Sequence, residues 1–160
     1  MIRACQPADA PRICAIYNHY VVHTVVTFEE APVDEYEMAK RITRVTGRFP
    51  WLAFERDGTV VGYAYADSWK DRSAYRHSVE TTIYVAADCH RSGVGRPLYQ
   101  ALIDDLRSRG VHCAIGGIAL PNDASVRLHE KLGFSKIGQF HEVGWKLGRW
   151  VDVGYWELRF

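Results

Sequence analysis

The sequence predicts a single domain of the α/β class (α+β by stricter usage), built on a mixed, mostly antiparallel sheet with helices on both faces. Three observations predict this class. Runs of β-branched and aromatic residues alternate with helical patterns along the chain. The first strands after the N-terminal helices flank a tight turn, and the last two strands follow one another, which favours antiparallel pairing. The 160 residues suit one domain, 1–160, with no linker, repeat or low-complexity segment.

The bulk composition argues against several classes of protein. The formal net charge is +1, so no strong field would attract nucleic acid or an anionic membrane. No apolar run reaches the length of about 18 residues that a spanning helix needs, and the N-terminus lacks the apolar core of a signal peptide. The cysteines form no Cys-x-x-Cys pair, so we expect neither a zinc site nor disulfides but reduced thiols in a cytoplasm; they are Cys5, Cys14, Cys89 and Cys113.

The N-terminal third predicts one short strand and two helices. Residues 2–4 suit the strand, and the helix after Asp9 places Ile13, Ile16, Tyr17 and Tyr20 on one side. Residues 25–28 are expected to break this helix as an extended piece. Asp34 is placed to cap a second helix that reaches about Thr46 and ends at Gly47 and Pro50.

A hairpin and a polar loop follow. Residues 51–56 and 59–66 are apolar alternating runs on either side of Asp57-Gly58, the strongest short hairpin signal available. Residues 69–77 are polar, aromatic and charged, and predict a loop that leads into the central strand.

The centre of the chain predicts a strand, a glycine loop and a helix. In the strand, Val79, Thr81, Ile83 and Val85 share one face, whereas Glu80, Thr82 and Tyr84 share the other. The helix has an apolar stripe at four-residue spacing and Pro97 in its first turn, where a missing N–H costs nothing; the stripe is Val94, Leu98, Leu102 and Leu106.

The C-terminal part predicts three strands and a helix. Gly110 marks the end of the central helix, and residues 113–119 suit a buried strand. A helix over 124–132 follows, with Asn122 or Asp123 as its cap and Gly133 as its end. Residues 134–140 and 151–158 are expected to be two closing strands, joined through residues 144–148.

The glycine loop is a candidate anion site. Gly93 and Gly95 stand at the start of the helix, where glycine permits positive φ and close approach of a ligand. Successive backbone amides of such a loop bind anions, and a diphosphate would fit. A plain turn between strand and helix also explains a bare Gly-x-Gly.

Strand, x-x-Gly-x-Gly and helix together resemble the acetyl-CoA motif of the GNAT superfamily of N-acetyltransferases. The resemblance implies a sheet splayed at the centre, acetyl-CoA as co-substrate and no metal. It implies that the diphosphate binds the loop, that pantetheine pairs with the exposed strand edge, and that Asn122 contacts the cofactor besides capping its helix. His90 replaces the usual Gln or Arg. The implied cofactor residues are Ile83, Tyr84, Val85, Arg91, Ser92, Gly93, Val94, Gly95, Arg96, Asn122 and Lys131.

Glu80 and His129 are the candidate catalytic residues. A carboxylate in the central strand of an apolar sheet is costly unless it has a role, although a solvated face or pairing with Arg72 or Arg76 would also explain it. An acceptor amine must lose a proton, and a carboxylate within reach could take it. His129 stands where the superfamily often has a tyrosine that protonates the leaving thiolate, and it is a candidate acid or second base; a partly buried helix histidine is the alternative.

Longer stretches resemble one branch of the superfamily, the phosphinothricin and methionine sulfoximine N-acetyltransferases. They include Thr27-Phe-Glu29, Trp69-Lys-x-Arg72, Leu120-Pro-Asn-Asp123, Ser125-Val-Arg-Leu-His-Glu130 and Asp152-Val-Gly-Tyr-Trp156. The resemblance implies acetylation of the α-amine of phosphinothricin, methionine sulfoximine or methionine sulfone, with Glu80 and His129 as the catalytic pair. It also implies a homodimer. The implied acceptor residues are Phe28, Lys70, Asp71, Arg72, Tyr75, Glu80, Thr81, Thr82 and Tyr84.

Three other functions stay open at this point. An acetyltransferase acting on a protein N-terminus or a lysine would want an open, often acidic groove, whereas Lys70 and Arg72 favour a small anionic acceptor. A non-catalytic acyl-CoA-binding module would not need Glu80 and His129. An interaction module that uses the aromatic C-terminus leaves the glycine loop and Glu80 unexplained.

Overall fold

The computed structural model describes residues 1–160 and contains one seven-stranded sheet in the order β1-β2-β3-β4-β5-β7-β6. All neighbouring strands are antiparallel except β4 and β5, which are parallel. The predicted mixed, mostly antiparallel sheet is therefore confirmed. The strands are β1 (Ile2–Ala4), β2 (Trp51–Arg56), β3 (Thr59–Ser68), β4 (Ser78–Val85), β5 (Cys113–Leu120), β6 (Ser135–Lys146) and β7 (Arg149–Arg159).

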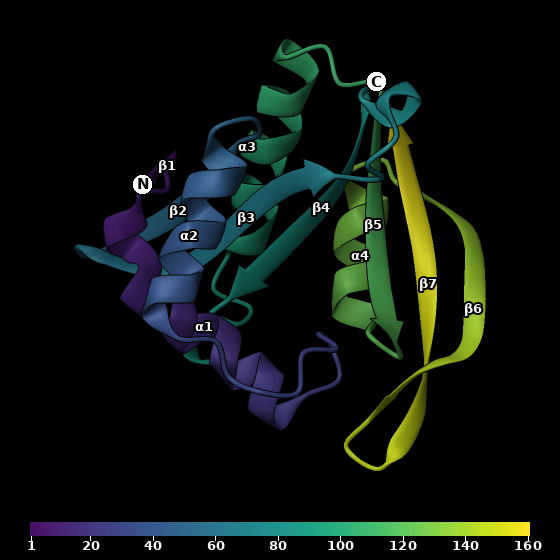
Figure 1. The fold of residues 1–160 in the computed structure, drawn as a ribbon, viewed down its shortest axis with the longest axis horizontal. Helices are drawn as coiled ribbons and strands as arrows, with labels where there is room; N and C mark the ends of the chain where they lie inside the picture. The colour runs from purple at the N-terminus through teal and green to yellow at the C-terminus, as the bar shows by residue number, and fades with distance from the viewer.

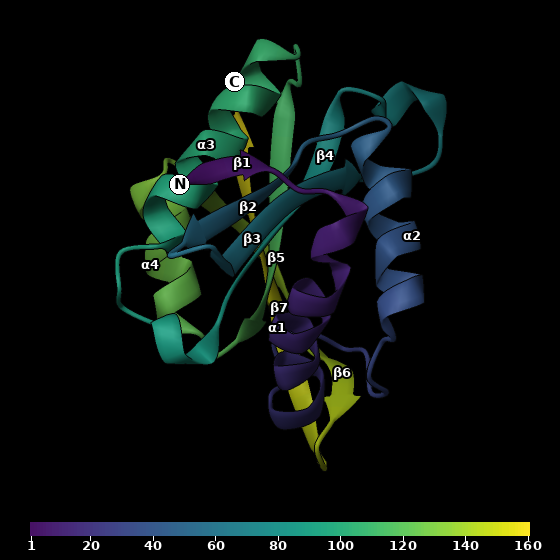
Figure 2. The same ribbon diagram turned by 90° about the vertical axis from the view of Figure 1, so that its left-hand side faces the viewer.

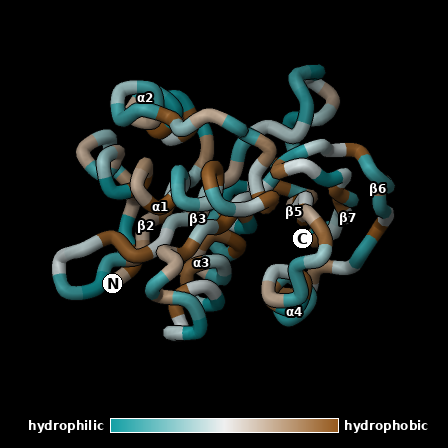
Figure 3. The backbone as a smooth tube through the Cα atoms, turned by 90° about the horizontal axis from the view of Figure 1, so that it is seen from below, coloured by the Kyte–Doolittle hydropathy of each residue, from teal (hydrophilic) through white to brown (hydrophobic).

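Helices cover both faces of the sheet, as predicted. The helices are α1 (Ala10–His23), α2 (Glu35–Thr46), α3 (Gly95–Ser108) and α4 (Asp123–Lys131), with short 3₁₀ turns at Pro7–Asp9, Ser73–Tyr75 and Ala87–Cys89. Figure 2 shows α1 and α2 on one side and α3 and α4 on the other. The predicted apolar stripe of α3 is buried against the sheet, and Figure 3 shows hydrophobic segments of α1, β3 and α3 in the interior.

The sheet opens between its two parallel strands. β4 pairs with β5 at only three positions, Ser78 with Cys113, Val79 with Ala114 and Glu80 with Ile115. Beyond Glu80 the strands diverge, because β5 follows β7 over its whole length while β4 follows β3. Figure 1 shows the resulting V between β4 and β5. The splay that the family resemblance implied is present.

Two local predictions were wrong. The closing strands are longer than 134–140 and 151–158, and the supposed link 144–148 belongs to their hairpin, whose turn is Leu147-Gly148 with both φ values positive. Gly144 lies inside the strand, and glycine is needed there because the Phe28 ring occupies the space where a side chain would be. Residues 25–27 bend instead of extending, since Val25 turns inward to pack with Ala119 and Val151.

Candidate active site

The free edge of β4 forms one wall of the site. No residue of β5 pairs with β4 beyond Glu80, so the edge of residues 81–85 that faces β5 can accept an extended, amide-containing group as an added strand. The predicted pantetheine residues, Ile83 to Val85, lie on this edge. Side-chain alternation along β4 is as predicted: Thr81 contacts Tyr99 of α3, whereas Tyr84 packs against Tyr17 of α1.

The glycine loop presents unused amides at the start of α3. Arg91 and Gly93 have φ values of 61° and 81°, which turn the chain back on itself. No hydrogen bond within the protein engages the amides of residues 91 and 93–96. The amide and the hydroxyl of Ser92 both donate to the Cys89 carbonyl, so Ser92 shapes the loop. Free amides at a helix N-terminus fit a diphosphate.

His90 anchors this loop to α1. The Tyr20 hydroxyl donates to the Val85 carbonyl and lies 2.6 Å from His90 Nε2. Because the carbonyl can only accept, His90 donates its Nε2–H to the Tyr20 oxygen. Burial raises the pKa of Tyr20 to about 12, which keeps this hydroxyl protonated. The hydrogen bond from His90 to Tyr20 therefore fixes the start of the glycine loop, and the free backbone amides of that loop are the groups available to contact an anion.

Helix α4 flanks the same loop. A Cβ on Gly95 would lie 3.6 Å from Leu128 Cδ2, so α4 packs beside the start of α3. Asn122 caps α4 by accepting a hydrogen bond from the Ser125 amide at 3.1 Å. Lys131 is exposed at the other end of α4 and forms no ion pair, which leaves its charge available for a phosphate group.

Replacing Gly93 with alanine tests the loop. Alanine at φ 81° is strained, at a cost of about 1 kcal/mol, and relief of that strain would turn the amides away from the anion. We expect Gly93→Ala to raise the KM for acetyl-CoA about tenfold. Gly110→Ala is the matched control, because Gly110 has φ 76° and open space around it but lies after α3. An equal KM in the two variants would contradict the assignment.

Glu80 approaches β5 from the α1/α2 face. Its Oε1 lies 3.5 Å from the position a Cβ on Gly117 would take, beside the Tyr155 ring. No side chain or amide of the protein hydrogen-bonds to this half-buried carboxylate. Burial raises its pKa, which Lys70 opposes and Asp67 reinforces. A carboxylate with a raised pKa and no partner is suited to accept a proton.

His129 approaches β5 from the opposite face and is 4% exposed. Its Nδ1–H donates to the Ser125 carbonyl at 2.8 Å, so in the neutral ring Nε2 accepts from the Tyr99 hydroxyl at 2.9 Å. Burial lowers the pKa of His129, which favours this neutral ring, although the bond to Ser125 opposes the shift. Tyr99 in turn lies 2.7 Å from the Thr81 hydroxyl on β4.

Two adjacent glycines bring these groups to one point of the sheet. A Cβ on Gly116 would lie 2.6 Å from His129 Nε2, and the neighbouring Gly117 faces Glu80. Both glycines directly follow Ile115, the last β5 residue that pairs with β4. Glu80 and the Tyr99–His129 pair therefore flank the opening of the sheet from opposite faces. Tyr99 was not predicted from the sequence, although its hydroxyl on the buried side of the helix after the glycine loop was an available signal.

The predicted acceptor residues occupy three regions, two of them outside β4. Lys70, Asp71, Arg72 and Tyr75 lie in the loop before β4, where Lys70 stacks 4.9 Å from the Trp69 ring and neither Lys70 nor Arg72 forms an ion pair. Phe28 lies in the connection between α1 and α2, and its ring packs over Gly144 of β6.

The third region of predicted acceptor residues lies along β4. Thr82 and Tyr84 share the face of Glu80, whereas the Thr81 side chain points to α3. Lys70 is close enough to Glu80 to influence its pKa. The structure thus brings Lys70 to the candidate base, whereas the Phe28 ring lies over Gly144 of β6.

An opened sheet with a strand edge, an anion-binding helix start and a candidate base defines an acyl-CoA-dependent transferase. Comparison with known proteins agrees: residues 2–154 match the family model described as acetyltransferase (GNAT) domain. The chain belongs to the GNAT acetyltransferase family, and acetyl-CoA is the co-substrate of its acetyl transfer.

Two curated relatives and two solved structures illustrate the similarity. A phosphinothricin N-acetyltransferase of Streptomyces viridochromogenes is 41% identical over 99% of this chain and 87% of its own. An L-methionine sulfoximine/L-methionine sulfone acetyltransferase of Salmonella typhimurium is 38% identical over 99% and 93%. A phosphinothricin acetyltransferase from Sinorhizobium meliloti, solved with acetyl-CoA, has a TM-score of 0.96 at 34% identity, covering 100% and 88%. A ribosomal-protein-alanine N-acetyltransferase from Brucella melitensis has a TM-score of 0.97 at 38% identity, covering 100% and 99%.

No group of three or more His, Cys, Asp or Glu side chains is arranged to hold a metal ion. None of the helices has the length and apolar character needed to cross a membrane. All four cysteines are free thiols.

Proposed function

We propose that this acetyltransferase acetylates the α-amine of a small amino acid whose side chain ends in a polar tetrahedral group, such as phosphinothricin, methionine sulfoximine or methionine sulfone. The observation that carries the proposal is the half-buried, unpaired Glu80 beside the uncommitted cation of Lys70, at the point where the sheet opens. The names of the relatives point to the same acceptors.

The cofactor side uses groups that the chain leaves free. The amides of residues 91 and 93–96 would hold the diphosphate, and the edge of Ile83 to Val85 would hold the pantetheine amides. Asn122 and Lys131, at opposite ends of α4, would supply separate contacts to the cofactor. When bound there, acetyl-CoA supplies the activated acetyl thioester. A free N–H on the opened edge of β4 is suited to polarise the thioester oxygen.

The acceptor side uses charge and proton transfer. Lys70 and Arg72 bind the acidic groups of the acceptor, and Tyr75, Thr82 and Tyr84 line its place on the Glu80 face, with Phe28 as a wall. Glu80, directly or through one water, takes the proton of the attacking amine. On the other face His129, with the Tyr99 hydroxyl as its hydrogen-bond partner, would assist proton transfer to the departing sulfur. Burial raises the pKa of Tyr99, so its hydroxyl stays protonated at neutral pH.

A thiol-release assay with separate acceptors tests this function. Purified protein and acetyl-CoA are mixed with phosphinothricin, methionine sulfoximine, methionine sulfone, methionine or an alanine-starting peptide. We expect release with the first three and at most a hundredth of that kcat/KM with methionine, which lacks the polar tail. Release with the peptide alone would refute the proposal. No release with any acceptor, while acetyl-CoA still raises the melting temperature, would favour a non-catalytic acyl-CoA-binding module.

A protein N-terminus is the second candidate acceptor. The observation that favours it is the likeness to the Brucella melitensis structure, which carries the name of a ribosomal-protein-alanine N-acetyltransferase. The peptide arm of the assay separates the two. The cations of the loop before β4 favour the small anionic acceptor, because a peptide offers no acidic group beside its α-amine unless its sequence supplies one.

We also propose that the chain forms a homodimer in the cytoplasm. Large apolar side chains are exposed along the β6–β7 hairpin, more than an isolated monomer favours; they are Ile137, Phe140, Val143, Trp145, Leu147 and Trp150. Sedimentation velocity measures the mass, and a monomer at tens of micromolar would refute the dimer. Free thiols suit a reducing compartment.

A further inference from the structure

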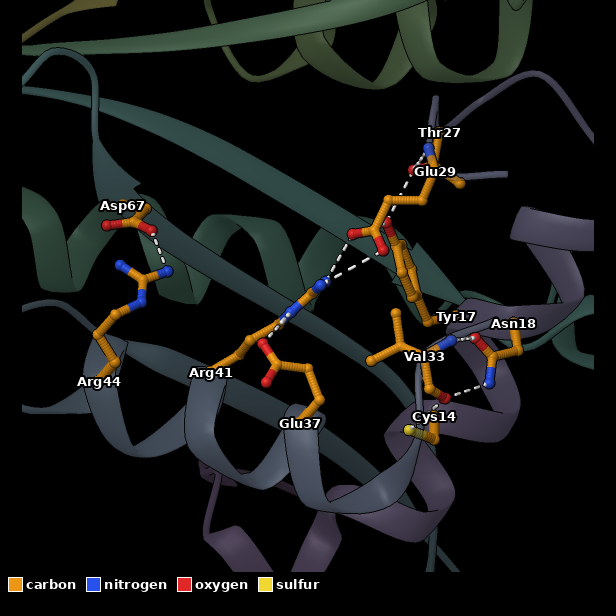
Figure 4. Close-up of polar contacts among 10 residues, drawn as sticks. All are labelled: Cys14, Tyr17, Asn18, Thr27, Glu29, Val33, Glu37, Arg41, Arg44 and Asp67. Atoms are coloured by element: carbon orange, nitrogen blue, oxygen red, sulfur yellow. Dashed lines mark hydrogen bonds and ion pairs between the residues drawn. The ribbon is translucent and has the colours of Figure 1, made fainter. Parts of the chain in front are cut away.

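The α1–α2 connection, residues 24–34, joins the two halves of the opened sheet. On the side of strands β1 to β4, the Asn18 side chain accepts a hydrogen bond from the Val33 amide at 2.9 Å and donates one to the Val33 carbonyl at 2.8 Å. Tyr17 donates to Glu29, which also receives Arg41 at 2.6 Å (Figure 4). These contacts come from α1 and α2 alone.

Strands β5, β7 and β6, on the other side of the opening, contact the same connection. Val25 packs with Ala119 of β5 and Val151 of β7 in a small cluster separate from the main core. The connection therefore spans the open end of the V, where β4 and β5 make no contact of their own (Figure 1).

Lys146 provides the polar part of this second attachment. It extends from β6, is only 2% exposed, and donates from Nζ to the Thr27 carbonyl at 2.7 Å. No carboxylate lies within ion-pair distance of it. Burying an ammonium group against a neutral carbonyl is costly compared with an apolar side chain at the same position. Burial lowers the pKa of Lys146, although Glu30 and Glu29 lie near enough to oppose the shift. The bond to the Thr27 carbonyl is the one hydrogen bond that its Nζ makes.

Phe28 follows Thr27 in the chain and packs against Gly144, the neighbouring inward-facing position of β6. Its ring lies directly over Gly144, where any Cβ would overlap it. Gly144 and Lys146 are two apart on β6 and face the same side. Strand β6 therefore holds the Thr27 carbonyl through Lys146 and the Phe28 ring over Gly144, and so determines the position of Phe28.

We propose that Lys146 is a positioning residue for the acceptor, acting through the Thr27 carbonyl to hold Phe28 in place across the open end of the sheet. The inference rests on the proposed function, in which Phe28 is a wall of the acceptor site. It concerns the acceptor alone, because the diphosphate loop and the edge of β4 make no contact with Lys146.

Lys146→Met tests the proposal, since methionine keeps the unbranched shape and most of the length of the side chain but removes the donor. We expect the KM for phosphinothricin to rise at least tenfold, the KM for acetyl-CoA to change less than twofold, and Lys146→Arg, which keeps a donor, to recover much of the loss. Lys136→Met is the matched control, because Lys136 is exposed on the same strand. Unchanged acceptor KM, or a parallel rise of both KM values, would overturn the proposal.

Two further measurements keep the outcome decisive. If Lys146→Met does not fold, Gly144→Ala retains the lysine and displaces the Phe28 ring; it must then raise the acceptor KM selectively, and failure to do so overturns the proposal. Hydrogen exchange of residues 24–33 needs no turnover. If the wild type acetylates no amino acid, the proposed function has failed, while faster exchange in Lys146→Met confined to this segment would still establish the attachment, and unchanged exchange would refute it.

Discussion

Glu80→Gln is expected to lower kcat/KM by about 10²–10⁴-fold without lowering the melting temperature. The amide has nearly the shape of the carboxylate but cannot accept the proton of the attacking amine. Steady-state kinetics with phosphinothricin or methionine sulfoximine measures the loss. The loss should shrink as the pH is raised past the pKa of the acceptor amine, because an amine that has already lost its proton needs no base.

The same substitution has a defined effect on stability. Burial raises the pKa of Glu80 above its ordinary value of 4.5, so the folded protein binds more protons than the unfolded chain between these two pKa values. Stability therefore falls as the pH rises through this window, and the charged carboxylate is a burden at neutral pH. Gln removes that burden, so the variant should melt at or above the wild-type temperature at pH 7 and lose this advantage below pH 4.5.

A control substitution at a second carboxylate and a contradicting outcome complete the test of Glu80. Glu142→Gln removes an exposed carboxylate from β6 and should leave both kcat/KM and the melting temperature unchanged. Activity of Glu80→Gln within a few-fold of wild type at neutral pH would exclude Glu80 as the base. A marked fall in its melting temperature would instead indicate that Glu80 stabilises the fold.

Gly116→Ala is expected to destabilise the protein by about 1–3 kcal/mol, the usual range for overpacking a core, and to lower kcat by about 10²-fold. The new Cβ would lie 2.6 Å from His129 Nε2 and 2.8 Å from its Cδ2. The ring cannot retreat easily, because Tyr99 and Phe134 pack against it with centroids 5.0 and 5.1 Å away. Displacing the ring breaks its bond to the Tyr99 hydroxyl.

Urea unfolding and steady-state kinetics read out the two effects. Gly138→Ala is the control, since Gly138 is also within a strand but a Cβ there would meet no atom within 4 Å. The control should keep kcat and lose little stability. If Gly116→Ala destabilises the protein but keeps wild-type kcat, the Tyr99–His129 pair is structural and the sulfur receives its proton from elsewhere.

Local sequence patterns determined most of the elements. The alternating run 79–85, the Asp57-Gly58 turn and the four-residue spacing from Val94 to Leu106 each depend on neighbours a few residues away, and each element is present. The family resemblance supplied the splay of the sheet and the acetyl-CoA chemistry. The roles of Glu80, His129 and the acceptor residues remain predictions.

Only the tertiary structure decided how distant residues share a space. Gly144 looked like part of a link because its neighbour Phe28 is 116 positions away in the chain, and no local pattern reports a ring lying over a strand. Lys146 in sequence is one more polar residue near a turn; its burial against Thr27 depends on packing of the hairpin with the α1–α2 connection. Tyr99 of α3 reaches His129 of α4 across 30 positions of sequence. His129 and Glu80 approach β5 from opposite faces because Gly116 and Gly117 have no side chains in their way.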